Sequence, residues 1–163
     1  MSENILEVQD LEIRYVTDEE TVRAVNDISF SLKEGESIGL VGETGAGKTT
    51  TALGIMGLVP DPPGEVVGGS IVFDGQDLLK LPEKQMREIR GGKISMIFQD
   101  PMTSLNPVMT VGDQIAEVVL LHNKMSKAQA KKRAMEMLEQ VGIPGSRCDD
   151  YPHQFSGGMK QRV

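Results

Sequence analysis

The sequence predicts an α/β fold: a parallel sheet with helices forms the core, an antiparallel β section precedes it, and a helical subdomain is inserted after it. Three observations support this class. The first 32 residues alternate between apolar and polar positions, a glycine-rich loop follows an unbroken apolar run, and two amphipathic helical patterns come later. With 163 residues, the chain is long enough for one domain with a hydrophobic core, or for part of one.

The N-terminal residues have the period of half-buried strands. Leu11, Ile13 and Tyr15 alternate with polar residues, and the same alternation recurs over residues 28–32. The polar, acidic stretch at 17–21 is typical of a hairpin loop. We therefore expect the chain to open with a small antiparallel β section.

The predicted core begins at residues 37–41, where apolar residues run without alternation. That pattern indicates a strand buried on both faces of a parallel sheet, and residues 94–98 have it too. After the glycine-rich loop at 42–49, residues 49–58 can be helical until the prolines at 60–63 forbid continuation. The sequence thus predicts a strand, a loop and a helix in direct succession.

Two strongly patterned helices follow a strand at 70–73 and a short helix from Pro82. Residues 111–122 have apolar side chains at helical spacing, and a second helix follows Ser126, which forms a capping-box pattern with Gln129. Gly142 marks the end of that second helix. A helical subdomain after the β-rich part is the consequence.

The glycine-rich loop has the pattern G-x-x-x-x-G-K-T of a phosphate-binding loop. Its glycines let backbone amides surround phosphates, Lys48 supplies a positive charge, and the Thr49 hydroxyl can ligate magnesium. Thr50 adds a hydroxyl nearby. The position after an apolar strand and before a helix favours nucleotide binding over an ordinary glycine-rich turn. The loop alone does not distinguish ATP from GTP.

Three further features are only suggestive by themselves. Tyr15 could stack on a purine ring or could be ordinary core. Gln99 follows a predicted buried strand, where parallel sheets place ligand residues. The segment 156–158, Ser-Gly-Gly, precedes a predicted helix and is a second potential anion site, although this triplet is common in loops. His122 and His153 are expected to be structural.

The order of these features resembles the ATP-binding cassette (ABC) family over the whole chain. More narrowly, the runs FQDPMTSLNP at 98–107 and YPHQFSGGM at 151–159 are similar to ATPase subunits of bacterial dipeptide and oligopeptide importers. The resemblance implies a partial nucleotide-binding domain, with the β section and phosphate-loop core at 1–100 and the helical subdomain at 101–163.

The resemblance also implies roles for individual residues. Tyr15 falls on the aromatic that stacks against adenine. Lys48 and Gln99 fall on catalytic positions, and Thr49 and Gln99 on positions near magnesium. The segment 156–158 falls on the signature, which reaches the γ-phosphate held by the opposite subunit of a head-to-tail dimer. The implied nucleotide-binding residues are Tyr15, Gly42, Glu43, Thr44, Gly45, Ala46, Gly47, Lys48, Thr49, Thr50, Gln99, Ser156, Gly157 and Gly158.

The cofactors implied are ATP and Mg²⁺. The partners implied are transmembrane permease subunits, a second ATP-binding subunit and, indirectly, a solute-binding protein, at the cytoplasmic face of the inner membrane. Peptides are the default cargo, with nickel or other small solutes left open. The net charge of -7 argues against nucleic acid. The alternatives are a soluble ABC ATPase not linked to transport, and a binding-only fragment without hydrolysis.

The acids that hydrolysis requires are not evident. Asp100 ends an apolar run but falls on the family's glutamine segment, while the family's magnesium aspartate, catalytic glutamate and switch histidine follow the signature. We therefore expect a chain ending at Val163 to be inactive alone, incomplete at its C-terminus and marginally stable, with unpaired apolar strand edges.

Overall fold

The computed structural model describes residues 4–99 and 104–163. These residues form two compact units, of which one ends at Arg90 and the other begins at Gly91. The division predicted from the sequence, between residues 100 and 101, lies outside the described residues and stays a prediction. Each unit is described by itself.

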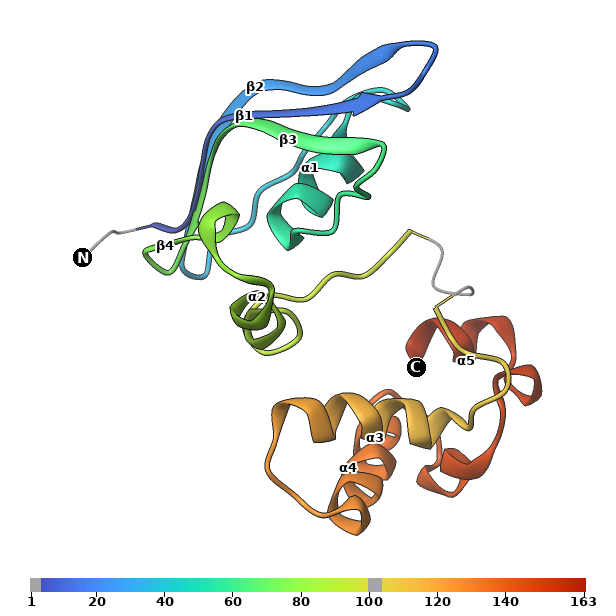
Figure 1. Cartoon of the computed structure of the whole chain (residues 1–163). Helices are drawn as coiled ribbons and strands as arrows, with labels where there is room; N and C mark the ends of the chain where they lie inside the picture. Colours follow the sequence, from blue (N-terminus) through green and yellow to red (C-terminus); the bar gives the residue numbers. More distant parts are fainter. Residues whose placement is uncertain (1–3, 100–103) are drawn as a thin grey trace. The chain divides into compact units, whose positions relative to one another are not determined.

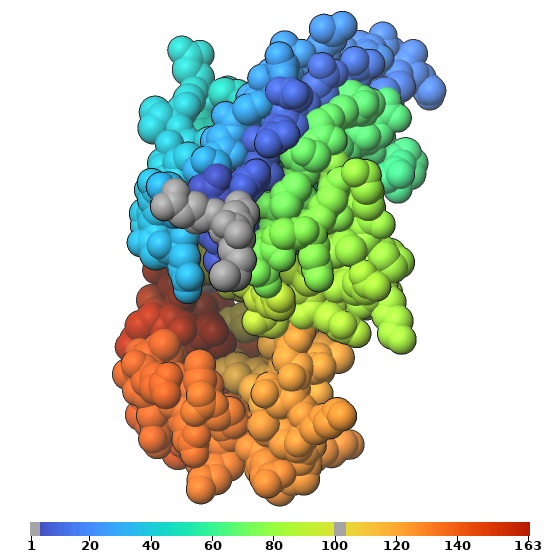
Figure 2. Space-filling model, turned by 90° about the vertical axis from the view of Figure 1, so that its left-hand side faces the viewer, coloured from blue at the N-terminus to red at the C-terminus, as the bar shows by residue number. Residues whose placement is uncertain are grey.

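The first unit is built on an antiparallel sheet with the strand order β2-β1-β3-β4. In Figure 2 its three long strands lie side by side as bands, β2 in light blue, β1 in dark blue and β3 in green. Val8 on the central strand lies opposite Phe30 of β2 and Ile71 of β3. This sheet confirms the predicted antiparallel section. The strands are β1 (Asn4–Val16), β2 (Thr21–Lys33), β3 (Gly64–Phe73) and β4 (Gln76–Asp77).

Helix α1 (Lys48–Met56) lies against the sheet in the first unit (Figure 1). Gly54 permits this close approach, because a side chain there would lie 2.8 Å from Cδ1 of Ile13 on β1. The helix ends at Met56, and Gly57, which follows it, has a left-handed φ of 60°. The helix was predicted over 49–58, so its existence is confirmed with slightly different ends.

Arg90 ties the carboxyl end of α1 to the end of helix α2 (Glu83–Ile89). Its Nε donates to the carbonyl of Met56 at 2.6 Å and its Nη2 donates to the carbonyl of Gly57 at 2.9 Å. Last-turn carbonyls have no partner inside their own helix, so a guanidinium at that end satisfies them and complements the helix dipole.

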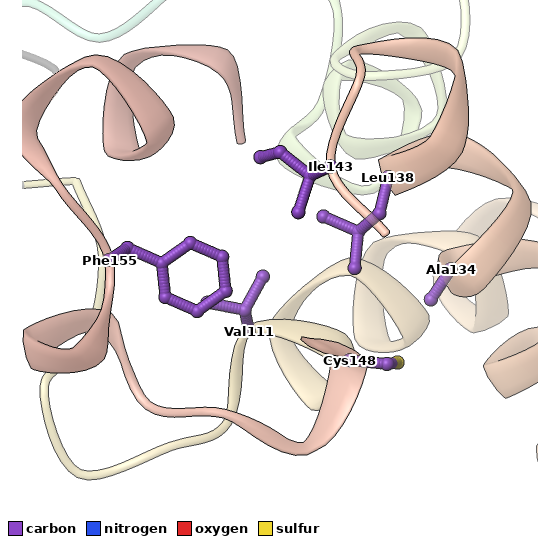
Figure 3. Packing of buried hydrophobic residues seen from close by; sticks show 6 residues of the cluster. All are labelled: Val111, Ala134, Leu138, Ile143, Cys148 and Phe155. Carbon is purple, nitrogen blue, oxygen red and sulfur yellow. The ribbon is translucent and has the colours of Figure 1, made fainter. Parts of the chain in front are cut away.

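The second unit is helical and has its own core. Figure 3 shows six buried side chains that point toward one another from α3, α4 and the turns that follow: Val111, Ala134, Leu138, Ile143, Cys148 and Phe155. The predicted helices and the capping box between Ser126 and Gln129 are confirmed. The elements are α3 (Val111–His122), α4 (Lys127–Gln140), η3 (Gly145–Asp149), η4 (Pro152–Gln154) and α5 (Gly157–Arg162).

Two segments predicted to be buried parallel strands are neither strands nor buried in this structure. Residues 37–41 and 94–98 belong to no strand, and Val41 is 98% and Ile97 is 92% exposed. An unbroken apolar strand needs neighbours that pair its backbone and layers that cover both faces. Within residues 4–99 and 104–163 no strand pairs with either segment, and most of their apolar side chains are exposed.

We predict that Leu138→Ala lowers the free energy of unfolding by about 2–5 kcal/mol, because it empties a fully packed position. Leu138 is 1% exposed. The matched control is Leu121→Ala on the neighbouring helix, where the leucine is 74% exposed and the change should stay within about 0.5 kcal/mol. Urea unfolding followed by circular dichroism measures both, and equal losses would contradict the core assignment.

Candidate nucleotide-binding site

The phosphate loop enters α1 through two glycines with left-handed backbone. Gly45 has a φ of 85° and Gly47 a φ of 81°, and the N–H of Ala46 donates to the carbonyl of Glu43 at 3.1 Å. A side chain at Gly47 would also overlap the carbonyl oxygen of Ala24 on β2. Gly47 is therefore required for two independent reasons, its φ and its contact with the sheet.

Thr51 stabilises the junction between the phosphate loop and α1. Its backbone N–H and its hydroxyl both donate to the carbonyl of Gly47, at 2.8 and 2.9 Å, and the residue is 3% exposed. This role of Thr51 was not predicted from the sequence. The signal was present, since Thr51 stands four positions after Gly47 in a helix, the spacing at which a threonine hydroxyl reaches a backbone carbonyl.

Lys48 closes the loop at its start. Its ammonium donates to the carbonyls of Gly42 at 2.7 Å and of Glu43 at 2.6 Å, which uses two of its three N–H groups. Among the described residues, the backbone N–H groups of Gly45, Gly47 and Thr49 donate to no backbone acceptor. Free amides at a helix N-terminus beside an ammonium form a site suited to an anion.

The charges around the loop favour an anion as well. A pocket of about 410 Å³ lies between β2, the segment before the loop and the loop itself. Among the described residues that line it, Arg23 and Lys48 are cationic, the others are uncharged and none is acidic. In a chain with a formal net charge of -7, two cations without a carboxylate among these lining residues mark a local preference for negative ligands.

The remaining residues of the loop and Tyr15 lie in the same unit. The Thr49 side chain is exposed at the start of α1, and Thr50 is half-buried. Tyr15 is half-buried on β1 between Val22 of β2 and Gly64 of β3. A side chain at Gly64 would lie 2.8 Å from Cε1 of Tyr15, so the ring covers this glycine.

The other predicted site residues lie in the second unit. Gln99 is exposed, and Asp100 is outside the residues that the structure describes. The hydroxyl of Ser156 accepts from the N–H of Met159 at 3.4 Å and caps α5. The structure thus brings together residues 42–50 in one loop, and residues 156–158 in a separate segment of the chain.

The two glycines of the signature segment, residues 156–158, differ from Gly47 in their backbone angles and in the space around them. Gly157 and Gly158 have no left-handed φ, and a side chain at either would meet nothing within 4 Å. Neither the backbone nor the packing of the described residues requires glycine there. The close approach of a separate molecule is a physical reason for glycine at such positions.

This chain resembles known proteins of one kind. The family model described as ABC transporter matches residues 25–163. The chain is 53% identical to the dipeptide transport ATP-binding protein DppD of Bacillus subtilis over 163 residues, covering 99% of this chain and 49% of that protein. It is also 53% identical to the oligopeptide transport ATP-binding protein OppD of the same organism, covering 98% and 45%. The chain therefore spans about half the length of the curated relatives it matches.

The fold resembles solved structures of the same kind. One is the ATP-binding cassette MJ0796 in a dimeric post-hydrolysis state bound to ADP and Pi, with a TM-score of 0.82 and 26% identity over 96% of this chain and 66% of that one. A second is cbiO1 from Clostridium perfringens, with a TM-score of 0.71, 26% identity, and coverage of 99% and 59%. These similarities confirm the predicted α/β cassette class, although residues 37–41 and 94–98 are not paired here.

We predict that Gly47→Ala costs more stability than Gly45→Ala, although both glycines have left-handed φ in the same loop. At Gly45 a side chain would meet open space, so only backbone strain of about 1–2 kcal/mol is added. At Gly47 the overlap with Ala24 is added to that strain, for a total of at least about 3 kcal/mol. Denaturant unfolding without nucleotide measures the difference, and equal losses would show that the loop is not packed on β2.

Proposed function

The chain belongs to the ABC transporter family, and from that premise we propose that it supplies ATP binding to an ATPase subunit of a bacterial peptide importer. The complete subunit would couple binding and hydrolysis of MgATP to transport across the membrane. The observation that carries the proposal is the loop at 42–49, where Lys48 and free helix-end amides converge. The named peptide transporters that resemble nearly the whole chain support the choice of cargo.

The roles of the loop residues follow from their chemistry. The amides of Gly45, Gly47 and Thr49 would hold the phosphates, and the third N–H of Lys48 is available to a phosphate oxygen. The exposed hydroxyl of Thr49 fits a magnesium ligand, because Mg²⁺ prefers oxygen donors and is held together with substrate phosphates. The aromatic face of Tyr15 would stack on adenine.

Gln99 is proposed to contact magnesium and the attacking water through its side-chain amide. Its carbonyl oxygen can ligate a hard cation and its NH₂ can orient a water molecule. Its exposure leaves the side chain free for these contacts. Thr49 and Gln99 would hold the magnesium ion, whose positive charge would favour hydrolysis of the phosphate.

The signature segment is proposed to serve a second ATP-binding subunit. Gly157 and Gly158 are exposed, and nothing in the described residues requires them to be glycine. Glycine at these positions would let a nucleotide bound to a head-to-tail partner approach the backbone of Gly157 and Gly158 closely, which a side chain would prevent. The dimeric state named for the similar cassette MJ0796 supports this arrangement.

The other partners proposed are transmembrane permease subunits and, through them, a solute-binding protein. The chain would act as a peripheral component at the cytoplasmic face of the membrane. Among the described helices, none has the length and hydropathy to cross a bilayer. Co-purification of the complete protein with two multi-spanning subunits tests this proposal, whereas a soluble dimer without them would favour an ABC ATPase that is not linked to transport.

We predict that Lys48→Ala abolishes ATP binding, because it removes both the loop closure and the charge. The control is Lys84→Ala on α2, an exposed lysine of the same unit. Isothermal titration of ATP should show no measurable heat for the first variant, and a Kd within about twofold of the parent for the second. Unchanged affinity of Lys48→Ala would refute the nucleotide-site assignment.

We also predict that Gly158→Ala separates stability from catalysis. Its melting temperature should match that of the parent, because the added methyl meets nothing. ATP hydrolysis by the complete protein should fall about tenfold or more, since about 1.4 kcal/mol of lost transition-state stabilisation is a factor of ten. A calorimetric melt with a steady-state ATPase assay measures both quantities. Full activity of this variant would exclude the proposed role of the signature segment.

A further inference from the structure

Arg147 on η3 contacts residues on both sides of the signature segment. Its Nη2 donates to the carbonyl of Gln154 at 2.9 Å, and its guanidinium lies 4.7 Å from the ring centroid of Phe155. Its Nη1 approaches Sδ of Met159 at 3.8 Å. One planar group therefore touches the chain before Ser156 and after Gly158.

The guanidinium is itself held in place. Its Nε donates to Oδ2 of Asp150 at 2.6 Å, and both side chains are 30% exposed. Charge-assisted bonds of this length are stronger than neutral ones, and partial burial reduces their screening by solvent. Asp150 thus fixes the guanidinium, which in turn fixes the turn that leads into α5.

Little else restrains α5. None of its six residues is buried, and Met159, together with Val163 just after the helix, packs partly against the core cluster. At its far end, Nη1 of Arg162 donates to the carbonyl of Val141 at 2.8 Å, next to the end of α4. The helix is consequently held by arginine contacts near both ends rather than by burial of an apolar face.

We propose that Arg147 is a positioning residue for the signature segment, acting through Gln154, Phe155 and Met159. The inference rests on the proposed function, in which residues 156–158 complete a nucleotide site across a dimer. Arg147 would keep their backbone in the orientation that the partner's nucleotide meets, without touching that nucleotide. Lysine can keep the pair with Asp150, but it lacks the planar fork that serves Gln154 and Phe155 at the same time.

The first test measures position without using activity. A nitroxide on Gly157→Cys reports the mobility of the segment, and the open space there accommodates it. Cys148 is 2% exposed and burial raises the pKa of its thiol, so it reacts slowly with the label. The complete gene product is used, with any cysteine outside these 163 residues replaced by serine.

The test variant is Arg147→Met, and the matched control is Arg133→Met. Arg133 is a half-exposed arginine on α4 that pairs with Glu136 at 3.2 Å, and among the described residues no hydrogen bond or ion pair joins its side chain to α5. We expect the nitroxide spectrum to sharpen in Arg147→Met, to change less in Arg147→Lys and to stay as in the parent in Arg133→Met. An unchanged spectrum in a folded Arg147→Met protein overturns the proposal.

The second test separates positioning from folding. Without the label, Arg147→Met should lower kcat for ATP hydrolysis about tenfold while KM changes less than about twofold, with Arg147→Lys recovering part of the loss. A collapsed melting temperature together with lost ATP binding would show a merely structural role and overturn the proposal. If Gly158→Ala is fully active, the proposed function of the segment fails, whereas the nitroxide result still decides whether Arg147 positions it.

Discussion

The contact between Gly47 and the carbonyl of Ala24 is the constraint on which the candidate site depends. Because of this close contact, the N-terminus of α1 packs directly on strand β2. The hydrogen bond from the Thr51 hydroxyl to the carbonyl of Gly47 stabilises this arrangement. With the helix start fixed, Lys48 can reach back to the first two residues of the loop. The anion site therefore forms because the N-terminus of α1 packs closely on the sheet. The other end of the same helix is held by the hydrogen bond from Arg90 to Met56.

The sequence predicts those parts of the fold whose signals are local. The hairpin, α3, α4 and the capping box at Ser126 are all found, because alternation, helical spacing and capping chemistry act within a few residues. The parallel strands at 37–41 and 94–98 are not found, since such strands form only when distant segments pair with them. An apolar run indicates that a segment requires burial and strand neighbours, but it does not show whether those neighbours are present.

The same distinction applies to the site. The phosphate loop is recognisable because its residues are consecutive, whereas Arg90 and Arg147 act on carbonyls and rings brought near by the fold. Thr51 is an intermediate case, with its partner one helical turn away. The reason why a given position needs glycine is the hardest feature to predict from the sequence. Only the structure separates Gly47, which the chain itself requires, from Gly158, which it does not.

The exposed segment that ends at Val41 has a consequence for the behaviour of the chain in solution. An apolar segment whose backbone pairs with no strand of the described residues can pair with another chain, so we expect self-association to compete with folding as concentration rises. The net charge of -7 opposes that encounter through long-range repulsion. Added salt screens the repulsion within about 8 Å at physiological ionic strength. Colloidal stability should therefore depend on ionic strength more steeply than the stability of either unit.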